Sequence, residues 1–262
     1  MIKYLKAKSI PLFLVDHFDS MDEKIAKELI QIGVDGIYIS MDGATKETYE
    51  KIQVGCDFDR VVKNIKNFVA LKEEMKSPIP ELCFRFIVTT LNVHEMPQFV
   101  ELVSSFGDRD SLGDGSHVDF AGLLEFAEIA HLKVPEVPEE ILRDTVTAGG
   151  KHGVLLTFAH TQLQELPPLE SCLAWMEPYI MMGGYVLPCC AVLMSNKREW
   201  LRQHSFGNVF EKSFEEIWYS ERYTRFRQMV NKPHGKVPLF CKGCRGYNTV
   251  EREQSYGVDM EL

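Results

Sequence analysis

Four cysteines in the second half of the chain are the residues best suited to chemistry: Cys172, Cys189, Cys241 and Cys244. Thiolates are soft ligands, which select iron-sulfur clusters or zinc over calcium or magnesium. Four of them can complete one four-iron cluster or one tetrahedral zinc site. The sequence therefore predicts a metal centre that is built from this part of the chain.

The spacing of the cysteines favours an iron-sulfur cluster over zinc. Zinc sites usually combine two knuckles, in each of which two to four residues separate the ligands. Only Cys241 and Cys244 form such a knuckle, since Cys172 stands alone and Cys189 is followed directly by Cys190. Zinc remains the alternative, and the adjacent pair leaves open whether Cys190 replaces Cys189 as a ligand.

The overall composition limits the class of protein. The 262 residues are 45% hydrophobic and 26% charged, which suits a folded globular chain with a large core. A net charge of -9 argues against nucleic acid as a partner. No apolar run reaches the length of a membrane span, and the seven irregularly spaced cysteines do not resemble a secreted disulfide framework. We therefore expect a cytoplasmic protein without a membrane segment or a signal peptide.

Short apolar runs alternate with amphipathic segments through the first half of the chain. Strands are expected at Leu12–Val15, Gly36–Ser40, Leu82–Thr89, Val118–Leu124 and Val154–Phe158. Helices are expected from a capping box at Ser20 and Glu23 to Gly33, shortly after Thr45, over residues 58–69, from Pro97 to Phe106 and from Pro138 to Gly149. This alternation predicts an α/β fold with a parallel sheet and helices outside it.

Polar residues follow the expected strands, where ligands bind in parallel sheets. They are Asp16, His17, Ser40, Asp42, Thr89, Asn92, Glu125 and His160. Each also suits a loop or a helix cap, and the run from Asp42 to Thr45 is a good turn with a cap. Position alone therefore does not separate binding residues from structural ones.

The βα pattern stops near Leu166–Leu169, where two consecutive prolines favour an extended linker. We expect a first domain over residues 1–165 and a second over 166–262. The second domain should contain a hairpin around Gly183 and Gly184, and a helix that begins with a capping box at Ser213 and Glu216.

These motifs resemble the radical SAM enzymes that carry a C-terminal SPASM or twitch-type iron-sulfur domain. Residues 39–50 resemble the fourth barrel strand of that family and the loop that follows it. Cys172, Gly184 and Cys189 fit its signature of Cys, Gly, four residues and Cys. The resemblance continues through residues 207–218 to the final cysteine pair and covers nearly the whole chain.

Two departures qualify the resemblance. The family holds its catalytic cluster with a Cys-x3-Cys-x2-Cys motif, which none of the seven cysteines forms, and the Gly-Gly-Glu type motif is also missing. The resemblance therefore implies a partial (β/α) barrel, from about the third strand onward, followed by a small cysteine-rich domain. A lesser departure is Gln53, where many relatives carry an arginine.

The resemblance also assigns sites and cofactors. The four cysteines named first would hold one auxiliary [4Fe-4S] cluster, because the two further cysteines of the two-cluster pattern do not follow Cys244. S-adenosylmethionine would lie near Ser40 and Asp42, with Arg85 and Thr89 on the next strand as weaker candidates. Cys56 and Cys83 are isolated in the sequence and are expected to be buried packing thiols.

The implied function is that of a fragment or truncated form of a radical SAM/SPASM enzyme. Such enzymes carry out radical modification of a peptide, a protein or a small molecule, and accept electrons from a reductant such as a flavodoxin or ferredoxin. A non-catalytic iron-sulfur or zinc-binding module is the main alternative. A complete α/β enzyme with incidental cysteines is a third interpretation. The residues identify neither a catalytic side chain nor the substrate.

Overall fold

The computed structural model describes residues 1–109, 115–123, 127–159, 173–189 and 198–231. The chain divides into two compact units, Met1–Glu165 and Leu166–Leu262. The first unit contains a parallel sheet with helices, and the second contains a short hairpin with helices. None of the helices within the described ranges is long and apolar enough to cross a membrane.

The sheet of the first unit has five parallel strands in sequential order. They are β1 (Phe13–Asp16), β2 (Gly36–Ser40), β3 (Glu81–Val88), β4 (His117–Gly122) and β5 (Leu155–Ala159). The predicted α/β fold with a parallel sheet is therefore confirmed, with strand bounds shifted by at most two residues at each end.

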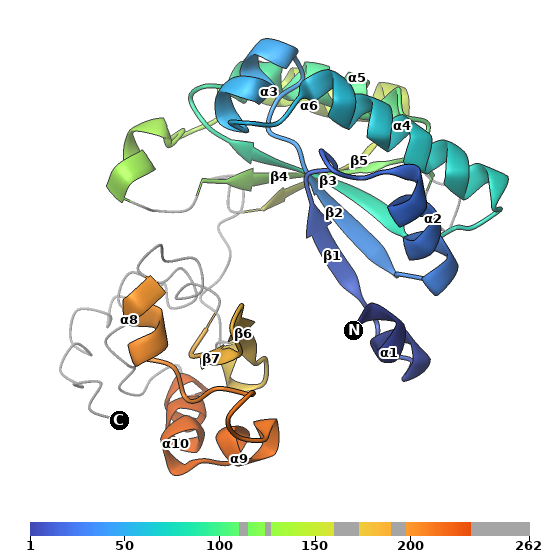
Figure 1. Cartoon of the computed structure of the whole chain (residues 1–262). Helices are drawn as coiled ribbons and strands as arrows, with labels where there is room; N and C mark the ends of the chain where they lie inside the picture. Colours follow the sequence, from blue (N-terminus) through green and yellow to red (C-terminus); the bar gives the residue numbers. More distant parts are fainter. Residues whose placement is uncertain (110–114, 124–126, 160–172, 190–197, 232–262) are drawn as a thin grey trace. The chain divides into compact units, whose positions relative to one another are not determined.

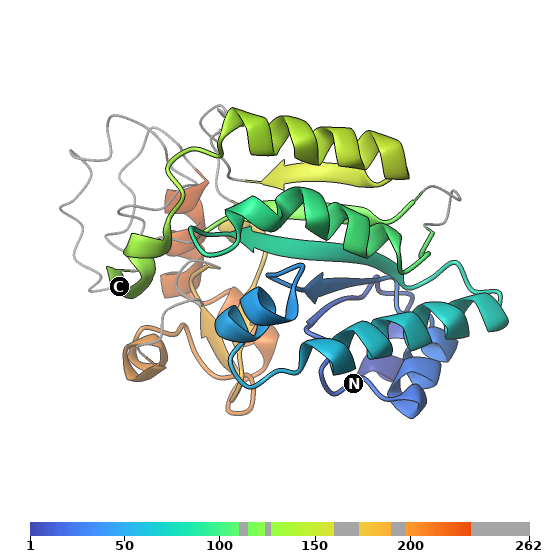
Figure 2. The same cartoon turned by 90° about the horizontal axis from the view of Figure 1, so that it is seen from above.

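The principal helices of this unit lie on one face of the sheet (Figures 1 and 2). The unit contains α1 (Ile2–Ala7), α2 (Glu23–Ile32), α3 (Lys46–Ile52), α4 (Phe58–Glu74), the short helix η1 (Val93–Glu95), α5 (Met96–Ser104), η2 (Ala127–Leu132) and α6 (Glu139–His152). Right-handed crossovers between strands in sequential order place their helices on the same side. The opposite face of the sheet, called the helix-free face below, carries none of α2, α4, α5 and α6.

Alternate strand residues point to the helix-covered face and form the core. Ile39, Phe84, Phe86 and Phe120 are fully buried there. The Phe86 ring centroid lies 4.8 Å from that of Phe99 on α5 and 5.5 Å from that of Phe120. These contacts fix which strand residues face the helices, so the intervening residues must point to the helix-free face.

Several helix ends differ from the prediction, since α4 continues to Glu74 and α5 ends at Ser104, before Phe106. The N-cap of α2 is Asp22 rather than Ser20, because the Asp22 carboxylate accepts a hydrogen bond from the Ile25 backbone N–H at 2.7 Å. Helix α6 continues past Gly149 to a left-handed cap at Gly153. Gly149 lies within the helix. A β-carbon at this position would come within 2.6 Å of the Leu156 side chain, so the glycine permits close contact between α6 and β5.

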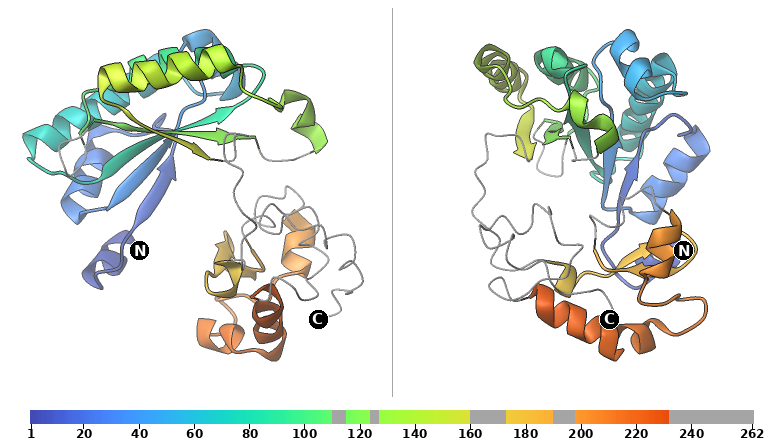
Figure 3. Two further views of the ribbon diagram at one scale, coloured as in Figure 1. Left: turned by 180° about the vertical axis from the view of Figure 1, so that it is seen from behind. Right: turned by 90° about the vertical axis from the view of Figure 1, so that its left-hand side faces the viewer.

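The second unit contains the predicted hairpin and capped helix (Figure 3). Its elements are η3 (Leu173–Trp175), the antiparallel strands β6 (Tyr179–Met181) and β7 (Tyr185–Leu187), and the helices α8 (Arg198–Gln203), α9 (Phe214–Trp218) and α10 (Glu221–Val230). Both hydrogen bonds of the capping box between Ser213 and Glu216 are present. Helices α8 and α10 were not expected from the sequence.

Candidate functional site

A row of polar side chains crosses the helix-free face of the first unit. Ser40 on β2 is in register with Arg85 on β3, Arg85 with Asp119 on β4, and Asp119 with Thr157 on β5. All four residues occupy strand positions that alternate with the buried core positions, so they share one face. The parallel register thus brings together four residues that are up to 117 positions apart in the sequence.

Arg85 is the central cation of this row. Its Nε and Nη2 atoms lie 2.9 Å and 2.7 Å from Oδ2 of Asp119, and its guanidinium carbon lies 4.7 Å from the ring centroid of Tyr38. The Asp119 side chain is only 8% exposed, whereas that of Arg85 is 39% exposed. The pair fixes the guanidinium and leaves Nη1 without a partner among the described residues. This atom could donate hydrogen bonds to a ligand on the helix-free face.

His117 extends the row at the start of β4. The Thr157 hydroxyl donates to Oδ1 of Asp119 at 2.9 Å, and His117 Nε2 lies 3.0 Å from the same hydroxyl oxygen. Since the hydroxyl has one proton to donate, we assign the imidazole proton to Nε2. Burial lowers the pKa of His117, and this effect outweighs the opposing influence of Asp119. The neutral imidazole therefore supports the Arg85–Asp119 pair through Thr157.

Asp42 lies just beyond β2 and is buried rather than open to a ligand. Its Oδ1 accepts a hydrogen bond from the Ile87 backbone N–H at 2.7 Å, and its Oδ2 accepts one from Gln53 Nε2 at 2.8 Å. Burial raises the pKa of Asp42, although both hydrogen bonds act in the opposite direction. The carboxylate ties the loop after β2 to β3. Ser40 is half-buried, and its hydroxyl lies 3.5 Å from the same Gln53 nitrogen.

Thr89 and Asn92 complete this connection beyond β3. Both are buried, and the Asn92 side-chain oxygen accepts hydrogen bonds from the Thr89 backbone N–H at 2.7 Å and the Thr89 hydroxyl at 3.0 Å. The Asn92 amide nitrogen donates to the backbone oxygens of Asp42 and Ile87. All hydrogen-bonding groups of the Asn92 side chain are thus used to join the two strand ends.

Glu95 is the residue at this edge that the sequence analysis missed. Its side chain is 5% exposed and accepts four hydrogen bonds, from the backbone N–H groups of Ala44 and Thr45 and from the hydroxyls of Thr45 and Thr48. Burial acts to raise the pKa of Glu95, but the hydrogen bonds prevail and hold it below its ordinary value. The only sequence signal was an acidic residue directly before the Met96–Pro97 helix start.

Of the remaining strand-end candidates, the two that the structure describes, Asp16 and His17, make local contacts instead. Asp16 and His17 accept hydrogen bonds from the backbone N–H groups of Phe18 and Asp19, respectively, and so form local turns. Glu125 and His160 lie outside the described residues.

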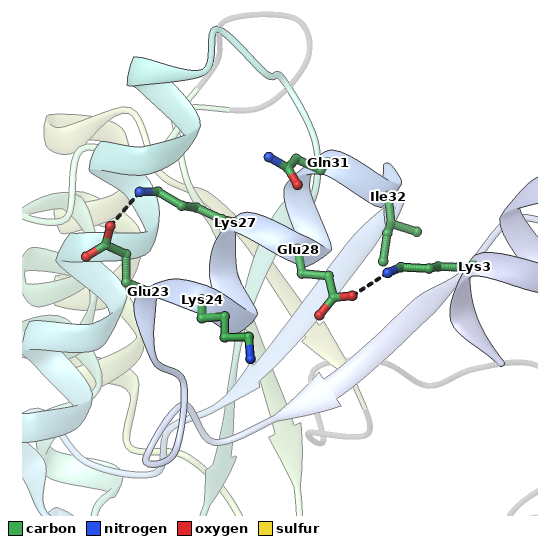
Figure 4. Close-up of a pocket in the computed structure, with 7 residues that line it drawn as sticks. All are labelled: Lys3, Glu23, Lys24, Lys27, Glu28, Gln31 and Ile32. Atoms are coloured by element: carbon green, nitrogen blue, oxygen red, sulfur yellow. Dashed lines mark hydrogen bonds and ion pairs between the residues drawn. The ribbon is translucent and has the colours of Figure 1, made fainter.

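A surface cleft of about 820 Å³ lies over α2 (Figure 4). Its walls carry exposed ion pairs, with Lys27 Nζ 2.5 Å from Glu23 Oε1 and Lys3 Nζ 2.6 Å from Glu28 Oε1. Exposed pairs of this kind are screened by water and contribute little energy. Opposite charges that satisfy one another give the cleft no selective preference for a ligand.

Of the four predicted metal ligands, the structure describes Cys189, which is buried at 8% exposure. Cys172, Cys241 and Cys244 lie outside the described residues, as does Cys190. Within the described part of the chain, no three metal-ligating side chains gather in one place. In the first unit, Cys56 is half-buried and Cys83 is buried, and burial raises the pKa of Cys83 to about 12.

The turn that precedes Cys189 is fixed by residues far along the chain. Gly184 has a φ of +86°, and a β-carbon on it would lie 2.5 Å from Oδ1 of Asn208. Asn208 Nδ2 donates to the Gly183 carbonyl at 2.8 Å, and the Val209 N–H donates to the Gly184 carbonyl at the same distance. The glycine and the asparagine therefore hold the hairpin from which Cys189 emerges.

Comparisons with known proteins agree with this arrangement. The family described as "SPASM: Iron-sulfur cluster-binding domain" matches residues 172–245, a range that includes all four cysteines. A tungsten-containing aldehyde ferredoxin oxidoreductase cofactor-modifying protein of Pyrococcus furiosus is 26% identical over 250 residues, which cover 87% of this chain and 64% of that protein. Residues 172–245 thus match a SPASM iron-sulfur cluster-binding domain, and most of the chain is similar to the Pyrococcus protein.

Further known proteins also match. An S-adenosyl-L-methionine-dependent 2-deoxy-scyllo-inosamine dehydrogenase of Niallia circulans is 28% identical over 71 residues, covering 27% of this chain and 26% of that enzyme. The crystal structure of Streptococcus suis SuiB matches with a TM-score of 0.61 and 14% identity, over 86% of this chain and 52% of SuiB. The chain thus spans about two thirds of the Pyrococcus protein and about half of SuiB.

The described residues around Cys189 fit an iron-sulfur group. Cys189 supplies a buried thiol within an apolar cluster that also contains Tyr223 and Phe226. The Tyr223 hydroxyl is buried and has no hydrogen-bond partner among the described residues. A thiol and a buried hydroxyl donor within one apolar cluster suit a sulfur-rich anionic group.

Proposed function

We propose that Cys172, Cys189, Cys241 and Cys244 hold one auxiliary [4Fe-4S] cluster, within a SPASM domain that spans residues 166–262. The match over residues 172–245, which includes all four thiols, carries this proposal. The buried position of Cys189 after the Gly184 turn supports it. When bound, such a cluster supplies an electron-transfer or ligand-binding centre.

We further propose that the domain over residues 1–165 contacts S-adenosylmethionine through the helix-free face of its sheet. Ser40 and Arg85 are half-buried there, and their hydroxyl and guanidinium groups suit the hydroxyls and carboxylate of this cofactor. Asp42 and Thr89 are buried, and they act by positioning the loops that follow β2 and β3. Asp119 acts by fixing the guanidinium of Arg85.

The reaction class proposed is radical modification, to which these 262 residues contribute part of the barrel and the SPASM domain. The Niallia relative is named as S-adenosyl-L-methionine-dependent, and SuiB has been crystallised with S-adenosylmethionine and with the precursor peptide SuiA. These relatives support a peptide, a protein or a small molecule as the substrate. A flavodoxin or ferredoxin is the class of reductant that such chemistry requires.

Metal analysis after anaerobic reconstitution tests the cluster. The chain should bind about four irons and four sulfides, because four thiolates complete one cubane. Cys241→Ser and Cys244→Ser should lose most of the iron, while Cys56→Ser and Cys83→Ser should retain it. Protein from iron-replete anaerobic cells that contains stoichiometric zinc and no iron would instead support a structural zinc module.

Calorimetric titration with S-adenosylmethionine tests the other site. Arg85→Gln should weaken binding about tenfold or more, the effect of losing a hydrogen bond to a charged group worth about 1.5–3 kcal/mol. Arg143→Gln is the matched control, since the Arg143 side chain is 66% exposed on α6. Equal affinities of the two variants would exclude Arg85 from the site. If the wild-type chain shows no measurable binding of S-adenosylmethionine, the residues on the helix-free face are not sufficient to bind this cofactor.

A further inference from the structure

Tyr223 is the most completely buried of the tyrosines that the structure describes in the second unit. It lies on α10 at 0% exposure, and its ring is stacked on that of Phe206 with centroids 4.3 Å apart. The Trp218 ring packs against its edge at 5.2 Å. These contacts hold the ring in one orientation and so fix the direction of the hydroxyl.

This hydroxyl has no hydrogen-bond partner among the described residues. A buried polar group without a partner costs about 1–3 kcal/mol, and native proteins contain few of them. Tyr223 is therefore unusual, because a phenylalanine would fill the same apolar space without this cost. We therefore look for a hydrogen-bond acceptor of the Tyr223 hydroxyl outside the described protein atoms.

The packing around the hydroxyl indicates where that acceptor lies. Tyr223 and Cys189 are both buried and belong to the same apolar cluster. A tyrosine hydroxyl keeps its proton at neutral pH and can donate a hydrogen bond.

Arg227 adds a fixed positive charge beside the same ring. Its guanidinium carbon lies 4.0 Å from the Trp218 ring centroid and 5.4 Å from that of Tyr223. Its Nη2 atom donates to the Trp218 carbonyl at 2.8 Å. A hydroxyl donor and a half-buried cation beside the same ring, in the part of the unit whose buried cluster includes Cys189, suit an anionic group.

We propose that the Tyr223 hydroxyl donates a hydrogen bond to a sulfur atom of the iron-sulfur cluster that Cys189 ligates. The inference rests on the proposed function, because it takes Cys189 as a cluster ligand. Hydrogen bonds to cluster sulfurs are among the features that set the reduction potential. The bond should strengthen when the cluster accepts an electron, since its sulfurs then become more negative. Tyr223 is thus a positioning and tuning residue, not a catalytic one.

Redox titration of the full chain, reconstituted anaerobically, tests this role. Tyr223→Phe should bind the same iron as wild type but have a lower midpoint potential, since the reduced cluster loses a donor. At a fixed potential we expect the ratio of reduced to oxidised cluster to fall about tenfold, which corresponds to about 59 mV for a one-electron couple. Tyr219→Phe is the matched control, since Tyr219 is 70% exposed just before α10.

A Tyr223→Phe variant with wild-type iron content and an unchanged potential would overturn the inference and leave the cluster assignment intact. Wild-type protein that binds no iron would overturn the proposed function itself. Should the Phe variant fail to retain iron, 3-fluorotyrosine at position 223 provides the second measurement. Its more acidic hydroxyl is a stronger donor and should raise the midpoint potential, and an unchanged value would again overturn the inference.

The cluster-free protein separates this role from a structural one. Removing an unpartnered hydroxyl should leave cluster-free Tyr223→Phe at least as stable as wild type towards urea. A loss of about 1 kcal/mol in the cluster-free protein would reveal a protein acceptor for the hydroxyl and would contradict the inference.

Discussion

The pKa values of two buried carboxylates near the carboxyl ends of β2 and β3 shift in opposite directions. Asp42 accepts one backbone and one amide hydrogen bond, and burial raises its pKa. Glu95 accepts four hydrogen bonds, which outweigh burial and lower its pKa. The number of hydrogen-bond donors thus decides whether the protonated or the ionised form of a buried carboxyl group is stabilised at this edge of the sheet.

Replacing Glu95 should therefore destabilise the first unit. Glu95→Gln leaves buried N–H and O–H donors with a weaker acceptor, and the expected loss is about 1–3 kcal/mol at neutral pH. The pKa of Glu95 is lower in the folded chain than in the unfolded one, so its stabilisation is complete above the unfolded value and is lost as the pH falls through the folded value. Urea unfolding from pH 3 to pH 7 measures both effects.

Glu47→Gln is the control for Glu95, since Glu47 is an exposed residue of the neighbouring α3. It should unfold at the same urea concentration as wild type across the range. Equal stabilities of the Glu47 and Glu95 variants would contradict the role assigned to Glu95.

Asp42 should give the opposite pH dependence. Its pKa is raised in the folded chain, so wild-type stability should fall as the pH rises above the unfolded value, until the folded pKa is passed. Asp42→Asn removes this titration and can keep the hydrogen bond from Ile87. The difference in unfolding free energy should therefore shift in favour of the variant between pH 4 and pH 7. A pH-independent difference would show that the carboxyl does not titrate in this range.

At the level of elements, β1 is the most exposed strand of the sheet. It pairs with β2, and no second neighbour is present among the described residues. Phe13 and Val15 on this strand are 60% and 70% exposed. An exposed edge strand with apolar side chains is a template for pairing with another chain.

We expect the chain to self-associate through β1 at high concentration. Val15→Lys should shift the molecular mass measured by light scattering towards the monomer, because a buried lysine in a new strand pair is unfavourable. Val54→Lys provides the same change at a position that is 86% exposed in the turn after α3. A wild-type chain that stays monomeric at high concentration would contradict this expectation.

At the level of the whole molecule, the cysteine distribution limits what these residues can do together. Within the 262 residues, Cys56 and Cys83 are the only cysteines before residue 166, and the other five lie beyond it. In the radical SAM enzymes that the chain resembles, reductive cleavage of S-adenosylmethionine needs a cluster held by three barrel cysteines, which leaves one iron open. The proposed SPASM cluster has four protein ligands and therefore no open iron.

These 262 residues alone should therefore yield no 5'-deoxyadenosine from S-adenosylmethionine under dithionite, even with the auxiliary cluster loaded. Chromatography of the reaction mixture measures the product, and a barrel segment that carries Cys-x3-Cys-x2-Cys, supplied in fusion, should restore it. Product above background that depends on Cys172 and Cys244 would mean that the cluster has been assigned the wrong role. A fusion that stays inert would favour a non-catalytic binding module.

The sequence by itself determined the order and type of most elements. Apolar runs predicted all five strands of the sheet, and helical periodicity predicted the helices between them. The glycine pair predicted the β6–β7 hairpin. The capping box at Ser213 predicted the start of α9 correctly, while a similar pattern at Ser20 was wrong by two residues because Asp22 supplies the cap. Such features depend on near neighbours in the chain, so they are visible without the fold.

Only the tertiary structure decided what the polar side chains do. Glu95 meets Ala44 and Thr45 about 50 residues away, and Arg85 meets Asp119 on the next strand, because the parallel register brings these segments together. The same holds for Tyr223, whose residue type gives no sign that its hydroxyl is buried and lacks a hydrogen-bond partner within the described ranges. Burial and hydrogen-bond partners set pKa values and ligand contacts, and both are properties of packing between distant segments rather than of local sequence.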